Sequence, residues 1–119
     1  MKYIFYDKTG MPIAYTYGDD IYLYDGTPVA YIYNDSYIYS IRGKHLGFFI
    51  DYWIIDLDGN YVFFTDNASG GMVKPTKRVA PVRSVRRVMP VKYTKEVARI
   101  KPVRKYNWSN KSGRMFFID

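Results

Sequence analysis

The sequence predicts an all-β protein of four tandem antiparallel β-hairpins in a pseudo-fourfold arrangement, extended by a basic segment and a C-terminal strand. Three observations predict this fold. Residues 1–70 repeat a glycine-centred unit four times. Residues 73–106 carry a β-branched residue at every third position, apart from a final tyrosine, and the final GRMFFID repeats the FFID of residues 48–51. A chain of 119 residues is the usual size of one compact domain, so these parts are expected to share one core.

The fourfold repeat is anchored on four glycines. Gly10, Gly26, Gly43 and Gly59 are separated by 16, 17 and 16 residues, and each is followed by an aliphatic residue after three positions and an aromatic residue after five. That alternation has the period of a strand, and Asp-Gly or Arg-Gly at the turn suits a tight hairpin. One hairpin is marginally stable in water, so the four are expected to form a closed barrel-like or propeller-like cluster.

These features resemble a known family. Four tandem hairpins of this length, rich in AYxY and DG and followed by a basic tail with prolines, are similar to the four-fold β-flower proteins of bacteria. The resemblance covers about residues 3–68 and the general character of the tail. The family has no assigned activity, so the resemblance implies a fold and carries over no catalytic residues.

The tail has a period of three. From Val73 to Tyr106 every third residue is β-branched, apart from the final tyrosine; the next column is largely basic, and the column before holds all four tail prolines. Interior prolines exclude an α-helix, and a strand would send successive valines to alternate faces. We therefore predict a polyproline-II-like segment over residues 71–106, with three residues per turn. Its candidate docking ridge is Val79, Val82, Val85, Val88, Val91, Val97, Ile100 and Val103.

Length and charge indicate where this segment goes. Thirty-four residues of polyproline II make a rod of about 105 Å, which must bend, wrap around the hairpins or project to other molecules. Residues 1–70 have a net charge of −5 and hold twelve of the fourteen tyrosines, whereas residues 71–119 have a net charge of +12. Aromatic-lined grooves are the usual receptors for polyproline II, so the hairpins are a candidate receptor within one chain or between chains.

The tyrosines divide into two predicted groups. Tyr15, Tyr17, Tyr31 and Tyr33 are expected to pack in the core or on one face, whereas the candidate aromatic surface is Tyr22, Tyr24, Tyr37 and Tyr39. We divide the chain into a four-hairpin domain at 1–70, the basic segment at 71–106, and a C-terminal strand at 107–119 that packs on the hairpins.

The chain shows no motif for catalysis or metal binding. Cysteine is absent, seven of the nine aspartates in residues 1–70 fall at predicted turns, and His45 lacks acidic neighbours at metal-ligand spacing, which predicts a packing or surface histidine. The sequence therefore predicts no enzyme, no cofactor and no small-molecule substrate. A start without a signal-peptide pattern, and no apolar run of about 20 residues, predict a cytoplasmic protein without a membrane span.

The predicted function is a binding or assembly module, in which the basic segment docks on the aromatic, acidic β surface and the partner is a second copy or another protein. An alternative is binding of nucleic acid or another polyanion. Its candidate contacts are Arg83, Arg86, Arg87, Lys92, Lys101 and Arg104. A third hypothesis is carbohydrate binding through exposed tyrosines.

Overall fold

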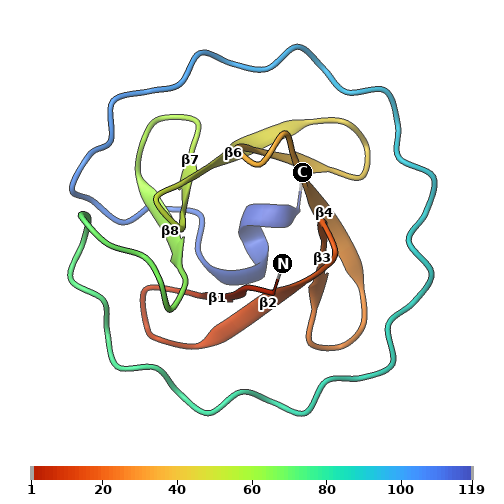
Figure 1. Cartoon of the computed structure of the whole chain (residues 1–119), viewed down its shortest axis with the longest axis horizontal. Helices are drawn as coiled ribbons and strands as arrows, with labels where there is room; N and C mark the ends of the chain where they lie inside the picture. The colour runs from red at the N-terminus through yellow and green to blue at the C-terminus, as the bar shows by residue number, and fades with distance from the viewer. Residues whose placement is uncertain (1, 119) are drawn as a thin grey trace.

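The structure is a computed structural model that describes residues 2–118, and it is an eight-stranded closed barrel made of four hairpins (Figure 1). Each strand pairs antiparallel with the next, and β1 also pairs with β8. The strands are β1 (Ile4–Tyr6), β2 (Pro12–Tyr17), β3 (Asp20–Leu23), β4 (Pro28–Tyr33), β5 (Tyr37–Ser40), β6 (His45–Ile50), β7 (Trp53–Asp56) and β8 (Tyr61–Phe64). The predicted all-β fold of four hairpins is confirmed.

The hairpins are copies of one design. In each, the pairing register shifts at one equivalent place on the first strand, as a β-bulge does: between Phe5 and Tyr6, Ile21 and Tyr22, Ile38 and Tyr39, and Ile54 and Ile55. The four anchor glycines lie at the hairpin tips with φ between 82° and 94°, a conformation that glycine adopts without the strain of a Cβ. An up-and-down topology puts all four tips at one end of the barrel and the turns between hairpins, the junction turns, at the other.

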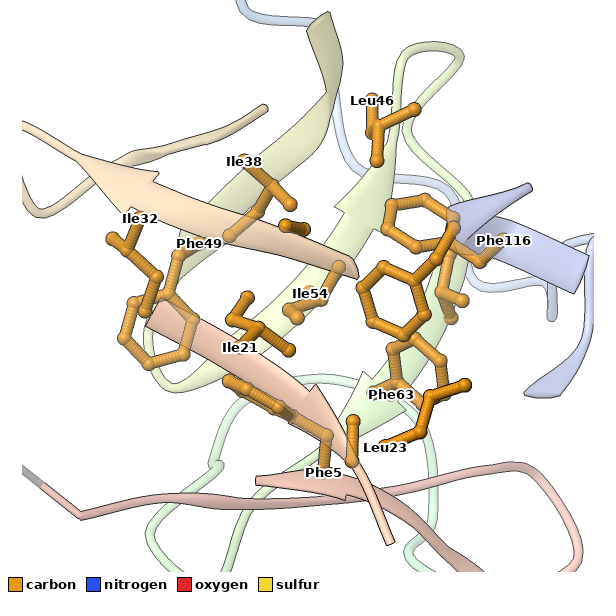
Figure 2. Close-up of a cluster of buried hydrophobic side chains, with 14 residues drawn as sticks. Phe5, Ile21, Leu23, Ile32, Ile38, Leu46, Phe49, Ile54, Phe63 and Phe116 are labelled. Carbon is orange, nitrogen blue, oxygen red and sulfur yellow. The ribbon is translucent and has the colours of Figure 1, made fainter. Parts of the chain in front are cut away.

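The barrel interior is filled by apolar side chains from all four hairpins (Figure 2). Phe5, Ile21, Ile38 and Ile54 occupy equivalent positions in the four units and are fully buried. Small barrels leave room only for side chains, so large and small residues alternate. The small residues Ala14, Ala30 and Gly47 of the repeat face this core, while Phe63 takes the equivalent place in the fourth hairpin.

The C-terminal residues close one end of the barrel, although not as a strand. Residues Gly113–Phe117 form a 3-10 helix, η1, which lies at the centre of the hairpins in Figure 1. Phe116 and Phe117 are buried against Phe63, and the Phe116 ring fills the space beside Gly47. The prediction of a C-terminal strand was wrong. A closed barrel has no free edge with which a ninth strand could pair, so the aromatic residues of FFID pack as a plug instead.

Residues 73–108, which we call the belt, run once around the outside of the barrel (Figure 1). The molecule measures 35 × 35 × 24 Å, and a circle 35 Å across has a circumference of about 110 Å, close to the length of about 105 Å expected for 34 residues of polyproline II. The belt contains no helix or strand, apart from one bridge between Trp108 and Tyr61. The match in length supports the polyproline-II-like backbone, which stays a prediction.

Candidate functional site

The belt is attached to the four hairpin tips at intervals of nine residues. The backbone N–H groups of Arg78, Arg87, Glu96 and Lys105 donate to the carbonyl oxygens of Gly10, Gly26, Gly43 and Gly59, at 2.8 to 3.0 Å. Each tip glycine also lies against the belt backbone two residues earlier: a Cβ built on Gly26 would be 2.2 Å from the oxygen of Val85. The tips therefore need glycine for their positive φ and for the close approach of the belt.

The sequence divides into four belt units of nine residues in the same register, at 73–81, 82–90, 91–99 and 100–108. Within each unit the second and fifth residues are basic and the eighth is Ala, Met or Asn. Sequence reasoning recognised the period of three and missed the period of nine. The signal that reveals it is the interruption of the basic column at every third step, by Ala80, Met89, Ala98 and Asn107.

The basic column faces inward, onto aromatic rings of the barrel. The Arg83 guanidinium lies 3.8 Å from the centre of the Tyr15 ring, and that of Arg86 lies 3.7 Å from the Tyr17 ring. In the next unit Lys92 and Lys95 lie 4.6 Å and 4.4 Å from Tyr31 and Tyr33. A cation over the face of an aromatic ring is attracted by the ring quadrupole, so these contacts hold the belt without burying aliphatic side chains.

Carboxylates of the barrel neutralise three of the basic residues of the belt. Lys77 pairs with Asp66, Lys92 Nζ lies 2.8 Å from Asp20 Oδ1, and Arg104 Nη2 lies 3.0 Å from Asp51 Oδ2. All three are partly exposed to solvent, so each stabilises the belt only modestly. The acidic charge of residues 1–70 and the basic charge of the tail therefore meet within one chain.

The rings beneath the belt are stacked pairs from neighbouring strands. Tyr15 stacks with Tyr22 at 6.2 Å between ring centres, and Tyr31 stacks with Tyr39 at 6.0 Å. Tyr22, Tyr24 and Tyr39 are at most 8% exposed, and burial raises the pKa of each of these phenols. Their rings lie on the outer face of the barrel, where the belt covers them, and Tyr37 is the member of the predicted aromatic surface that is half-buried.

The exposed tyrosines are different from those predicted. Tyr17 and Tyr33, which were expected to pack, are 58% and 40% exposed, whereas Tyr15 and Tyr31 are buried. Strand alternation puts Tyr15 and Tyr17 on the same face, yet Tyr17 is the last residue of β2, next to a junction turn. The prediction for Tyr17 and Tyr33 was wrong because same-face placement does not show how completely each ring is covered: Arg86 and Lys95 lie over these rings and leave them partly exposed.

The apolar column of the belt faces solvent. We call these residues the outer ridge: Val73, Val79, Val82, Val85, Val88, Val91, Val97, Ile100 and Val103, all between 86% and 94% exposed. The prediction that this ridge docks on the chain's own hairpins was wrong, because the basic side chains occupy the inward positions. Lys and Arg have long apolar stems and a cationic head, so they cover tyrosine rings better than the short valine side chain does. Docking of the ridge on another molecule stays a prediction.

The candidate polyanion contacts belong to two different columns of the belt. Arg83, Arg86, Lys92 and Arg104 belong to the inward column and contact tyrosine rings or carboxylates of the barrel. Lys101 lies in the same column, although no ion pair involves it within residues 2–118. Arg87 belongs to the third column, with Arg78, Arg99 and Lys105, and its side chain is exposed. Most of the predicted contacts are therefore already in use within the chain.

The segment that leads into the belt and the last residue of the belt meet at Trp53, which we call the clasp. Trp53 is 1% exposed, and its indole N–H donates to the carbonyl of Ser69 at 2.9 Å. Its ring lies 6.2 Å from that of Trp108, and Gly71 leaves space for it, since a Cβ there would be 2.8 Å from the indole. Two segments that are 39 residues apart, at Ser69 and Trp108, thus close the ring around the fourth hairpin.

Cavities lie between hairpin tips near the C-terminal residues. Two of them have volumes of about 330 and 380 Å³; Lys44, Arg99 and Lys111 line the first, and Arg42 and Phe117 line the second. Within residues 2–118, no group of three His, Cys, Asp or Glu side chains is placed to hold a metal ion. The same residues include no helix long and apolar enough to cross a membrane.

The fold and belt together define a class: a small barrel of four repeated hairpins, encircled by the basic tail of the same chain. The family model of the 4-fold beta flower protein matches residues 4–117, so the chain belongs to that family. The resemblance seen in residues 3–68 is thereby confirmed, and the match extends it over the tail. Comparison with curated proteins found no match, and comparison with solved structures found none.

Proposed function

We propose that this chain is a non-enzymatic protein-binding module whose contact surface is the outer ridge of the belt. The observation that supports this most directly is the exposure of nine Val and Ile side chains, each at least 86% accessible, on a backbone already fixed to the barrel. Apolar groups that the fold does not bury and that follow a regular line mark an interaction surface. A pre-ordered segment also loses little conformational entropy on binding, which favours affinity.

The first partner to test is a second copy of the chain. The outer ridge is flanked by exposed Arg78, Arg87 and Lys105, so it suits an acidic, apolar surface. The junction end of the barrel offers such a surface: Tyr17, Tyr33 and Tyr52 are at least 40% exposed there, and Asp19 and Asp35 make no ion pair within residues 2–118. Contact between unlike surfaces of two copies would be heterologous and salt-sensitive.

Sedimentation velocity tests this proposal across protein concentration and ionic strength. Wild type is expected to associate, and a Val82→Ser, Val91→Ser double variant to weaken association at least about tenfold while melting like wild type. Met115→Ser, which removes a 60% exposed apolar side chain outside the belt, is the matched control and should associate like wild type. A protein that stays monomeric at all concentrations would reject a second copy as the partner.

Polyanion binding is the second candidate, and the third column of the belt supports it. Arg78, Arg87 and Lys105 are exposed, project from an ordered backbone, and make no ion pair within residues 2–118. Binding of labelled single-stranded DNA at about 50 mM salt, with affinity that falls steeply as salt rises, would support this function. Replacing these three residues with Gln should abolish the binding. Lack of binding by the wild type would remove the candidate.

A further inference from the structure

The third belt unit departs from the other three at one position. The residue that donates its N–H to the tip glycine is basic in three units, as Arg78, Arg87 and Lys105, and acidic in the third, as Glu96. Glu96 makes two further bonds: its Oε1 accepts from the backbone N–H of His45 at 2.8 Å, and its carbonyl accepts from the Tyr39 hydroxyl at 3.0 Å. This unit is tied to β5 and β6 by contacts that its counterparts lack.

His45 lies beneath this unit and uses both ring nitrogens. Its side chain is 0% exposed, Nδ1 accepts from the backbone N–H of Arg99 at 2.9 Å, and Nε2 lies 2.9 Å from the carbonyl oxygen of Gly47. Because Nδ1 accepts a hydrogen bond, the single proton of the neutral ring is on Nε2, which donates to Gly47. One imidazole thus connects the belt backbone to the barrel strand.

The other hairpins have no titratable equivalent near neutral pH. Two residues after the tip glycine, Pro12 and Pro28 occupy the position of His45 in the first two hairpins, and proline has no N–H to satisfy. In the fourth hairpin Tyr61 takes this position, and its N–H donates to the carbonyl of Asn107 at 2.9 Å. Among these four residues only histidine changes charge between pH 5 and 8.

We propose that His45 is a proton-operated latch for the third belt unit, residues 91–99. In the neutral form, Nδ1 holds the Arg99 amide and the unit stays closed. When a proton from solvent binds Nδ1, that nitrogen becomes a donor facing the Arg99 N–H donor, so the hydrogen bond is lost and the unit is released. His45 is among the residues that line a cavity of about 330 Å³, although its ring is buried while the unit is closed.

The surroundings of His45 favour the neutral ring while the belt is closed. Burial, the largest effect, lowers the pKa of His45, and the positive charge of Arg99 adds to this, whereas the bond to Gly47 and the charge of Glu96 act in the opposite direction. Other groups facing the ring or the adjoining cavity are Tyr37, Tyr39, Lys44, Asp56, Asp58 and Lys111. Because the closed form binds the proton less readily than the open form, closure is fully favoured above pH 6.5 and weakens as pH falls below it.

Amide hydrogen exchange tests the latch with an internal control. As pH falls from 7.5 to 5.5, protection of the Glu96 and Arg99 amides, corrected for intrinsic exchange, should drop by up to about tenfold, the limit set by one pH unit below an open-state pKa near 6.5. The Arg78, Arg87 and Lys105 amides, which make the same bond in the other units, should keep their protection. The chain has one histidine, so its imidazole NMR signals report the titration directly.

Two variants separate the latch from general acid destabilisation. His45→Asn keeps an acceptor oxygen near the place of Nδ1 without titrating near neutral pH, so the third unit should be held at both pH values. Combining His45→Pro with Glu96→Arg reproduces the residue pairs of the first two units and should abolish the pH dependence even if the asparagine variant does not fold. Persistent pH dependence in this double variant would overturn the proposal, as would wild-type protection that stays constant while His45 titrates. Neither result depends on what the outer ridge binds.

Discussion

The barrel and the belt share one fourfold repeat but are stabilised in opposite ways. Each barrel unit of 16 or 17 residues pairs its strands with one another and buries side chains around the axis, whereas each belt unit of nine residues bonds only to the barrel. Nine residues at about 3.1 Å span about 28 Å, a quarter of the circumference of about 110 Å. The two repeat lengths differ because a quarter of the circumference is covered either by one hairpin of 16 or 17 residues, which folds back on itself, or by nine extended residues.

This difference predicts that substitutions lower the free energy of unfolding most at the barrel axis and least on the outside of the belt. The axis carries the apolar core, the hairpin tips carry the backbone contacts, the inward column of the belt carries cation–aromatic contacts, and the outer ridge carries none of these. Substitutions made in that order should destabilise the fold progressively less. Each step of the series tests the contrast between a region with its own core and one without.

The largest effect is expected at the axis, from Phe116→Ala. Phe116 is 1% exposed and packs on Phe63 and Phe117 inside the barrel end, so its removal leaves a cavity and should cost about 3–5 kcal/mol in the free energy of unfolding. Chemical denaturation measures this loss. Met115→Ala, at the exposed neighbouring position, should change stability by less than about 0.5 kcal/mol. Equal effects at both positions would mean that η1 is not part of the core.

The next effect is expected at a hairpin tip, from Gly26→Ala. The new Cβ meets the Val85 oxygen and weakens the bond from Arg87, and the positive φ of 91° adds strain, for a total of about 3 kcal/mol. Gly18→Ala is the matched control, because its φ is 62° but no atom lies within 4 Å of the added carbon; it should cost only about 1 kcal/mol. Similar losses for both variants would contradict a tight belt contact at the tips.

The hairpins could be predicted from sequence because their signals are local. Gly26 in its turn and the alternation of Ala30 with Tyr31 specify a hairpin wherever they occur, and repetition implies closure. The direction of the belt columns could not be predicted in the same way. A period of three separates the columns without telling which one faces inward. Hydrophobicity alone favours Val82 as the inward residue, whereas the stacked tyrosines on the outside of the barrel favour Arg83.

A smaller effect is expected from the inward column, for which Arg83→Gln is the test. Losing the guanidinium over Tyr15 should cost about 0.5–1 kcal/mol, the range for a cation–aromatic contact that water still reaches. Arg87→Gln removes the same charge one position outside the inward column and should be close to neutral. Urea denaturation of both variants at low and high salt measures the difference. If the Arg87 variant lost as much, net charge rather than ring contact would hold the belt.

The smallest effect is expected on the outer ridge, where Val82→Ser should alter the free energy of unfolding by less than about 0.5 kcal/mol, because the side chain is 94% exposed. Met89→Ser, in the same unit, provides the contrast: its side chain packs on the buried cluster of Tyr15, Tyr22 and Tyr24, so about 1 kcal/mol should be lost. Thermal melts of dilute protein compare the two without association. A large loss in the free energy of unfolding for Val82→Ser would mean that the ridge packs within the monomer. A neutral result would mean that the nine regularly spaced apolar side chains of the ridge do not stabilise the fold, which favours a role in contact with another molecule.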